Sequence, residues 1–326
     1  MAPGVKPVEP IDLADIRAAR ERIAGAAIRT PLVRLEMSGA SAEVWLKLEC
    51  LQPIGSFKIR GAANAMALAD PARLARGVYT GSAGNMAQGV AYEARRRGIP
   101  CRVIVPDTAP AAKLDAIARL GATAVPVPFA EWWAVLRDHG HPGEDGFFVH
   151  PVSDPAVIAG NGTIGLEVVE DLPEVRALVV PFGGGGLSCG IATALRALRP
   201  RARVFAAEVE TAAPLAASLG AGRPVEVPYT PSFVDGIGAT GLLAGMWPLA
   251  RVLLAGSRVV SLEDVRGAIR LLAERAHVVA EGAGGAAVAA ALDSLPDTGN
   301  GPVVAVVSGG NIDARVLAAI LAGRSP

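Results

Sequence analysis

The segment Gly55-Ser56-Phe57-Lys58-Ile59-Arg60-Gly61 contains the residue best suited to covalent chemistry. An apolar strand expected over residues 44–48 precedes it, and an alanine-rich helix expected from Ala62 to Ala69 follows, so Lys58 should lie at a helix start among apolar neighbours. Burial and the positive end of a helix dipole both disfavour the ammonium form. They lower the lysine pKa and leave an amine able to attack a carbonyl compound. The alternative is a lysine whose stem packs while its head reaches water.

Four consecutive glycines, Gly183 to Gly186, lie between an apolar strand and a helix expected from Leu187 to Leu198. Such a run lets successive backbone amides converge on an anion, and the helix N-terminus adds its dipole. Ser188 and Cys189 exclude the G-x-G-x-x-G pattern, and no Lys-Ser/Thr pair makes it a Walker loop. A turn with positive φ accounts for one or two glycines but poorly for four. The segment therefore predicts a phosphate site that is not specific for a nucleotide.

Residues Gly81-Ser82-Ala83-Gly84-Asn85-Met86 also end a strand and start a helix. Their free amides, the Ser82 hydroxyl and the Asn85 amide can hold a carboxylate. The alternative is an ordinary helix cap provided by Ser or Asn.

A second glycine-rich stretch, Gly282 to Ala287, matches the dinucleotide pattern G-x-G-x-x-A. That pattern requires an acidic residue at the end of the next strand, whereas the strand expected over residues 303–307 ends in Ser308. Close packing of a helix on a strand is therefore the expected role of these glycines.

The elements that must position these residues alternate along the chain. Short apolar strands are expected at residues 44–48, 78–80, 101–105, 124–127, 147–149, 178–181, 204–207 and 303–307, most of them followed by a helix. Strands that are apolar on both faces indicate a parallel sheet covered by helices on both sides. The Pro- and Gly-rich stretch 223–241 is expected to be irregular.

Composition excludes several classes of protein. The chain is 51% hydrophobic, but charges interrupt every apolar run before the roughly 18 residues that a membrane span requires. Lys+Arg 31 and Asp+Glu 31 give a formal net charge of +0, so neither a nucleic acid nor a membrane is an expected partner. The three scattered cysteines have no metal-ligand spacing. The N-terminus has no apolar signal-peptide core, and a cytoplasmic location is expected.

Taken together, these stretches resemble the fold-type II pyridoxal-phosphate (PLP) enzymes of the threonine/serine dehydratase and serine racemase branch. The resemblance covers nearly the whole chain, with its motifs in the same order. They are residues 46–49, Gly55 to Ala62, Ser82 to Asn85, His150-Pro151, Ile158 to Ile164, Gly183 to Leu187, Asp235-Gly236-Ile237 and Ser308 to Asp313.

This resemblance implies an α/β fold like that of the tryptophan synthase β chain. Two open, twisted, mostly parallel sheets would carry helices on both faces. Residues 1–52 and 152–326 would form a large PLP-binding domain, and residues 53–151 a small mobile domain that closes on the substrate, with the Lys58 helix at the interface. A homodimer acting on a small amino acid is the family expectation.

The resemblance also implies a role for each motif residue. Lys58 and Ser82 are the catalytic candidates, and Lys58 resembles the lysine that binds the PLP aldehyde. Gly183, Gly184, Gly185, Gly186 and Leu187 resemble the phosphate cradle, Asn85 the partner of the ring hydroxyl and Ser308 the hydroxyl at the pyridine nitrogen. Phe57 and Glu281 complete the expected cofactor-binding set, and Ser82, Ala83, Gly84, Asn85 and Met86 form the expected substrate-binding loop.

Three departures from the family pattern bear on the reaction. Racemases of this branch have a proton-donating serine where this chain has Ala83, which favours elimination. Met86 replaces the usual histidine and Val152 the usual phenylalanine, so a bulkier β-substituent is conceivable. The expected reaction is dehydration of L-threonine or L-serine to a 2-oxo acid and ammonia.

Alternatives remain open at this point. Phenylserine or 3-hydroxyaspartate are candidate substrates, and a serine racemase-like enzyme, a β-replacement synthase or a binding protein on a decayed fold are candidate classes. Several relatives bind Mg²⁺ or Ca²⁺ where this chain has Glu208 and Ala212. Pro214 stands where a third, carboxylate ligand is needed, so a metal there is doubtful.

Overall fold

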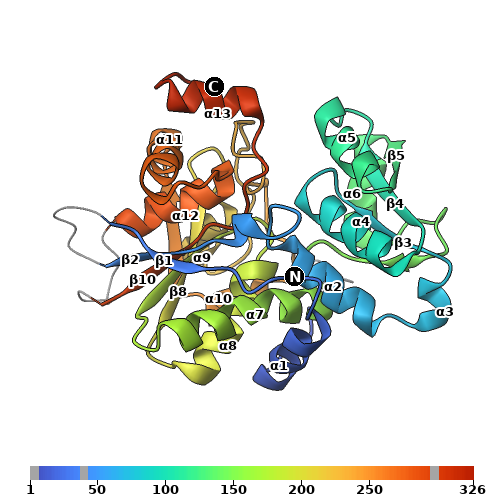
Figure 1. Cartoon of the computed structure of the whole chain (residues 1–326), viewed down its shortest axis with the longest axis horizontal. Helices are drawn as coiled ribbons and strands as arrows, with labels where there is room; N and C mark the ends of the chain where they lie inside the picture. Colours follow the sequence, from blue (N-terminus) through green and yellow to red (C-terminus); the bar gives the residue numbers. More distant parts are fainter. Residues whose placement is uncertain (1–6, 37–42, 294–300) are drawn as a thin grey trace.

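The computed structural model describes residues 7–36, 43–293 and 301–326, which form two sheets flanked by helices (Figure 1). The larger sheet has the strand order β1-β2-β10-β7-β8-β9. Only the pairing of β1 with β2 is antiparallel. The strands are β1 (Leu32–Arg34), β2 (Val44–Lys47), β10 (Val303–Val306), β7 (Ala177–Pro181), β8 (Arg203–Val209) and β9 (Gly256–Val260).

The smaller sheet has the order β5-β4-β3-β6 and is parallel throughout. Its strands are β3 (Val78–Gly81), β4 (Cys101–Pro106), β5 (Thr123–Val127) and β6 (Phe147–Phe148). All four come from one continuous part of the chain, which forms the right-hand body in Figure 1. The predicted architecture, two mostly parallel sheets with helices on both faces, is confirmed.

The helices between these strands fall into groups by the sheet they cover. Those near the smaller sheet are α3 (Pro71–Leu74), α4 (Asn85–Arg97), α5 (Ala111–Arg119) and α6 (Phe129–Asp138). Those of the larger body are α1 (Leu13–Arg22), α7 (Pro155–Asp171), α8 (Gly186–Leu198), α9 (Pro214–Ala221), α10 (Trp247–Leu253), α11 (Leu262–Leu271), α12 (Gly282–Leu292) and α13 (Ala314–Leu321), with the short turns η1 (Glu49–Leu51) and η2 (Leu272–Ala276). Between the two bodies lies α2 (Lys58–Leu68).

Strand β7 shows why the larger sheet is buried on both faces. Ala177 and Val179 pack in one core cluster with α11 and α12, whereas Leu178 and Val180 pack in a second cluster with α7 and α8. Alternate residues of a strand point to opposite faces, so a strand covered on both sides must be apolar throughout.

Glycines allow the helices around α7 to approach closely. A Cβ on Gly160 would lie 2.4 Å from the Arg60 carbonyl oxygen of α2, and one on Gly190 of α8 would lie 2.4 Å from the Ile158 carbonyl oxygen. In the Gly282 stretch, a Cβ on Gly285 would lie 2.7 Å from Ile269 of α11. That contact joins two helices rather than a helix and a strand. The predicted packing on a strand is seen at Gly284, where a Cβ would lie 3.2 Å from Cγ1 of Val307, directly after β10.

The described residues contain no helix long and apolar enough to cross a membrane.

Candidate functional site

A cavity of about 480 Å³ lies where the strands of both sheets end. Its lining includes the last residues of three strands, Gly81 of β3, Pro106 of β4 and Pro181 of β7, as well as Ser308, which follows β10. The carboxyl ends of parallel strands are the usual binding edge of such sheets, and the volume lies within the range of small-molecule sites.

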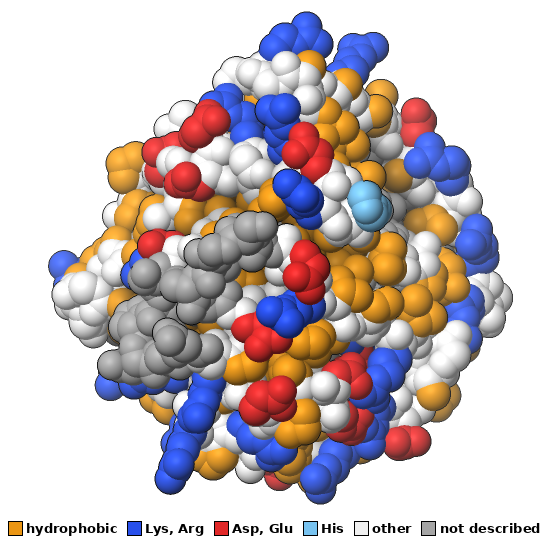
Figure 2. All heavy atoms as spheres, turned by 60° about the vertical axis from the view of Figure 1, so that its left-hand side comes forward, with side chains coloured by type: hydrophobic (Ala, Val, Ile, Leu, Met, Phe, Trp, Pro, Cys, Tyr) orange, Lys and Arg blue, Asp and Glu red, His pale blue; other side chains and the backbone are white. Residues whose placement is uncertain are grey.

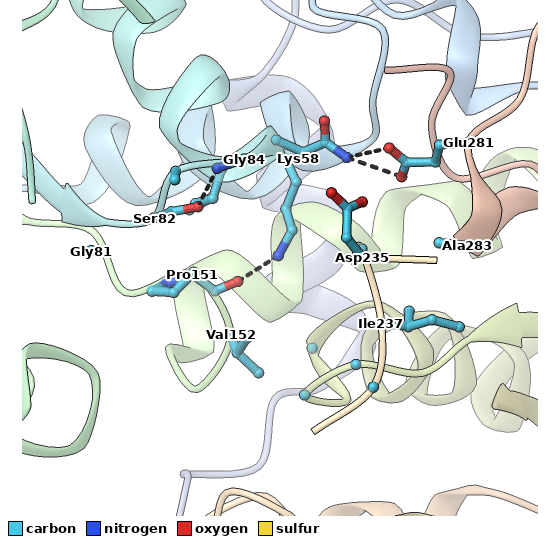
Figure 3. A pocket seen from close by; sticks show the side chains of 18 of the residues that line it. Lys58, Gly81, Ser82, Gly84, Pro151, Val152, Asp235, Ile237, Glu281 and Ala283 are labelled. Carbon is cyan, nitrogen blue, oxygen red and sulfur yellow. Dashed lines mark hydrogen bonds between the residues drawn. The ribbon is translucent and has the colours of Figure 1, made fainter. Parts of the chain in front are cut away.

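Lys58 begins α2, as predicted, and its ammonium group points into this cavity (Figure 3). Its Nζ donates to the Pro151 carbonyl oxygen at 2.7 Å and lies 5.2 Å from the centre of the Phe57 ring. Burial lowers the pKa of Lys58 to about 8, although the nearby Glu281 carboxylate partly opposes the shift. A lysine enclosed in this way is available as a neutral amine near physiological pH, which supports the nucleophile interpretation over a water-exposed lysine.

Ser308 is held beside Lys58 by the backbone. The Phe57 amide donates to the Ser308 carbonyl at 3.0 Å, and Ser56 forms a bridge with Gly309. Ser308 is 2% exposed, and no group among the described residues hydrogen-bonds its hydroxyl. The cavity thus has a free hydroxyl at the end of the central strand of the larger sheet.

The four glycines form the turn from β7 into α8. Gly185 has φ +94°, and a Cβ on Gly184 would lie 2.5 Å from Val152 Cγ1. A Cβ on Gly186 would lie 2.8 Å from the Val152 carbonyl oxygen, so side chains do not fit there. The first amides of α8, including that of Leu187, have no carbonyl partner within the helix and line the cavity, which is the arrangement expected for an anion site.

The loop of Ser82, Ala83 and Gly84 forms another wall. The Gly84 amide donates to the Ser82 hydroxyl at 3.2 Å. Gly84 is the N-cap of α4 and no side chain caps the helix, so the ordinary cap by Ser or Asn is absent. The first α4 amides remain available for a carboxylate. Met86 also lines the cavity, but it is 1% exposed and packs mainly in the core of the smaller body.

Asn85 crosses the cavity and joins the two bodies. Its Nδ2 donates to both Glu281 carboxylate oxygens at 3.0 Å, and its Oδ1 accepts from Asn311 Nδ2 at 2.7 Å. Burial raises the pKa of Glu281 to about 7, against the effect of the Asn85 hydrogen bonds. In this structure the Asn85 amide is therefore fully engaged by protein groups.

The residues considered for a metal serve another purpose. The Glu208 carboxylate accepts from the Leu215 and Ala216 amides, both at 2.8 Å, and from the Ser257 hydroxyl at 2.6 Å. It thereby caps α9, while Ala212 lies in the preceding turn. Within the described ranges no group of three His, Cys, Asp or Glu residues is arranged to hold a metal ion. The structure gives a metal at Glu208 and Ala212 no support.

Several cavity residues were not identified from the sequence. Lys113 of α5 forms a 2.6 Å ion pair with Asp235 across the mouth, and Trp132 and Leu136 of α6 line the wall. The spacing of Trp132 and Leu136 by four residues is a helical signal that was available. The pairing of Lys113 with Asp235 joins residues 122 positions apart, and no local pattern reveals it.

On the face of the molecule shown in Figure 2, basic and acidic side chains are interspersed with apolar ones, without a broad area of one charge. This distribution agrees with the formal net charge of +0.

Comparison with known proteins assigns the chain to a family. The family model described as pyridoxal-phosphate dependent enzyme matches residues 23–309. An L-threonine ammonia-lyase from Thermotoga maritima is 40% identical over 318 residues, which cover 95% of this chain and 78% of the relative. A serine racemase from Oryza sativa subsp. indica is 35% identical over 320 residues, covering 94% and 92%. The solved structure of maize serine racemase superposes with a TM-score of 0.87 at 33% identity, covering 97% of this chain and 98% of that one. The chain therefore belongs to the fold-type II pyridoxal-phosphate dependent enzymes.

Proposed function

We propose that this enzyme is an ammonia-lyase that converts a β-hydroxy amino acid, L-threonine or L-serine, into a 2-oxo acid and ammonia. The observation that carries the proposal is the position of Lys58. An amine with a pKa of about 8 faces a single cavity that also contains two helix-start loops suited to anions. The 40% identity to an L-threonine ammonia-lyase supports the same reaction.

The residues fit PLP on grounds of space and chemistry. The glycine cradle leaves room only for backbone, so its amides can approach a phosphate closely. Lys58 would hold the aldehyde carbon, and the unpartnered Ser308 hydroxyl would face the pyridine nitrogen. Phe57, Asn85, Glu281 and Leu187 would complete the enclosure, with Asn85 or Glu281 exchanging a present hydrogen bond for one to the cofactor.

When bound, PLP supplies a conjugated ring that accepts the electrons left at Cα. The chain supplies the base, since Lys58 in its neutral form can remove the Cα proton. The Pro151 carbonyl oxygen accepts a hydrogen bond from Lys58, which fixes the direction of the amine. A carbonyl carries no net charge, so it forms no ion pair with the lysine. The Cα proton and the β-hydroxyl leave together as one water, and one water then hydrolyses the released 2-imino acid. The net products are the 2-oxo acid and ammonia, and no other reactant is consumed.

The substrate carboxylate is assigned to the Ser82–Gly84 loop, where the free amides of α4 and the Ser82 hydroxyl can hold it. Ala83 has no proton to give to Cα from this side. The rice and maize relatives are named serine racemases. For this chain we propose elimination rather than racemisation as the main reaction.

The same proposal includes a small domain, residues 53–151, that closes on the substrate against a large domain formed by residues 1–52 and 152–326. It also includes assembly as a homodimer. The contacts of Asn85 with Glu281 and Asn311 link the smaller body to the larger one at the cavity, so a closing movement would have to break or replace them.

The first experiment compares the purified enzyme with Lys58→Ala. The wild type should show the visible band of lysine-bound PLP and form 2-oxo acid from L-threonine or L-serine, and the variant should lose both. Chiral analysis of the remaining amino acid belongs in the same assay. Formation of D-isomer without 2-oxo acid would replace the lyase by a racemase, and a protein that cannot bind PLP would refute both.

A further inference from the structure

The wall of the cavity beside the Ser82 loop is formed by apolar side chains. It consists of Pro106, Ala109, Pro110, Trp132 and Leu136, which we call the apolar wall. Strands β3 and β4 are neighbours, and the Ser82 amide donates to the Ile104 carbonyl at 3.1 Å, so the turn after β4 lies directly beside the carboxylate loop. A substrate with its carboxylate on that loop therefore has this wall close to its side chain.

Two residues of α6 are held firmly in this wall. Trp132 and Leu136 are one helical turn apart and share a face of α6. A Cβ on Gly81 would lie 3.2 Å from Leu136 Cδ2, so Leu136 already fills the space next to the loop. Trp132 packs against the cluster of Tyr79, Ile104, Val127 and Val135.

His150 connects the same part of α6 to the lysine. Its Nε2 lies 3.0 Å from the Leu136 carbonyl, and its Nδ1 accepts from the Val152 amide at 3.0 Å and the Ser153 amide at 2.8 Å. These bonds fix the proton on Nε2. The next residue, Pro151, accepts the Lys58 hydrogen bond (Figure 3). One short segment, residues 150–153, therefore contacts both Leu136 of the wall and the Lys58 amine.

Among the described residues that line the cavity, no cation is free to bind a second carboxylate. Lys58 is reserved for the reaction, and Lys113 is already paired with Asp235 at 2.6 Å. Asp235 and Glu281 would repel an anionic side chain. In the described part of the chain, the polar groups of the wall region are the Thr108 hydroxyl and the unpartnered indole N–H of Trp132, and both are uncharged.

We infer that the enzyme selects β-hydroxy amino acids whose β-carbon carries an apolar group, from the methyl of threonine to an aromatic ring, and that Trp132 and Leu136 set this preference. The inference rests on the proposed lyase activity and names its substrate class. A hydrophobic contact separates substrates that differ by one methylene by about 10-fold or more, so threonine should exceed serine by that factor in kcat/KM. An unpaired carboxylate against the wall should cost at least about 100-fold.

The test is a panel of L-serine, L-threonine, L-phenylserine and L-3-hydroxyaspartate, with kcat/KM for 2-oxo acid formation measured on the PLP-loaded enzyme. We expect threonine and phenylserine to exceed the other two. If 2-oxo acid forms but serine or 3-hydroxyaspartate is best, the inference is wrong and the lyase assignment stands. If none of the four gives 2-oxo acid, the proposed function itself fails.

A charge placed in the wall tests the residues directly. In Leu136→Arg the ratio of 3-hydroxyaspartate to threonine kcat/KM should rise at least about 10-fold, because the guanidinium can pair with the distal carboxylate. Trp133→Arg is the matched control, since Trp133 is on the same helix, is 41% exposed and does not line this cavity. An unchanged ratio in a PLP-binding Leu136→Arg enzyme would overturn the assignment.

Trp132→Phe provides a second, milder variant. It keeps an aromatic face and removes the N–H, so the ranking of substrates should persist if the wall acts through apolar contact. A reversal of the ranking would show that the indole N–H selects a polar group instead.

Discussion

At the scale of single residues, the decisive feature is a partly buried lysine that faces the cavity. Among the described residues, the Pro151 carbonyl accepts the hydrogen bond of Lys58, and the Glu281 carboxylate is the charge that raises its pKa. Burial disfavours the ammonium more than Glu281 favours it, so the pKa falls from 10.5 to about 8.

This balance predicts the pH dependence of cofactor binding. PLP uptake by the PLP-free enzyme requires the neutral amine, so its rate should rise with pH with a midpoint near 8 and level off above that pH. Absorbance time courses at a series of pH values measure it. Glu281→Gln removes the charge that favours the ammonium and should move the midpoint below that of the wild type. A rate that keeps climbing towards pH 10.5 would contradict the lowered pKa.

At the scale of elements, α2 is anchored two residues beyond the reactive lysine. Arg60 is 1% exposed and donates to both Glu49 oxygens at 2.8 Å and to Glu167 of α7 at 2.6 Å. Lys47 of β2 completes the group with a 2.6 Å bond to Glu167. Two cations and two carboxylates thus join a strand and two helices in an arrangement that is neutral overall.

Removing one member should leave a buried charge unbalanced. Arg60→Gln is expected to lower the free energy of unfolding by about 3–5 kcal/mol, measured by urea denaturation. Arg20→Gln is the control, because Arg20 forms its ion pair with Glu170 at 40% exposure and should cost less than about 1 kcal/mol. Equal losses in the two variants would show that burial of the network is energetically unimportant.

Much at this scale was accessible from the sequence, and the failures have physical causes. Helix α8 was predicted from Leu187 to Leu198 and runs from Gly186 to Leu198, because the run of glycines before it marks its start. Strand β9 was not predicted, since Gly256-Ser257-Arg258 forms a half-exposed edge strand without an apolar run. The capping of α9 by Glu208 was not predicted. The Glu208 carboxylate was considered only as a metal ligand, whereas the amide that it accepts from is seven residues away in the sequence.

For the site, the sequence predicted which residues stand at the ends of strands and helices. It did not predict which of these elements contact one another. The glycine loop, Lys58 and Ser308 each stand at the junction of a strand and a helix or turn, where composition carries information. The pair of Lys113 with Asp235 and the bridge from His150 to Leu136 depend on tertiary packing that no local pattern encodes.

At the scale of the whole molecule, His150 belongs to the boundary between the two bodies. It binds the last turn of α6 in one and the segment leading into α7 of the other, and its ring stacks on His139 at 4.3 Å. Burial, with a smaller contribution from His139, lowers the pKa of His150 to about 3.

This shift predicts acid sensitivity. Between pH 3 and 6.5 the unfolded chain binds a proton at His150 that the folded protein does not, so stability falls as pH drops below 6.5, by up to about 1.4 kcal/mol per pH unit. Glu281 acts oppositely, because its raised pKa of about 7 makes stability fall as pH rises from 4.5 to 7. Urea titrations at a series of pH values give the free energy of unfolding as a function of pH for the PLP-free wild type and for His150→Phe. The difference between the two slopes is the contribution of His150. Parallel slopes would refute its contribution.

The pairing of β10 between β2 and β7 has a consequence for the order in which the enzyme is made. Strand β10, one of the two central strands of the larger sheet, is made after all the other strands of the described residues. The turn that holds Lys58 is attached to its end through Phe57 and Gly55. Until Val303 to Gly310 have emerged, β2 has only β1 beside it, and Lys58 lacks the contacts that fix its turn. Cofactor capture therefore requires that the chain has been made at least as far as Gly310, and a nascent or truncated chain without β10 should not retain PLP.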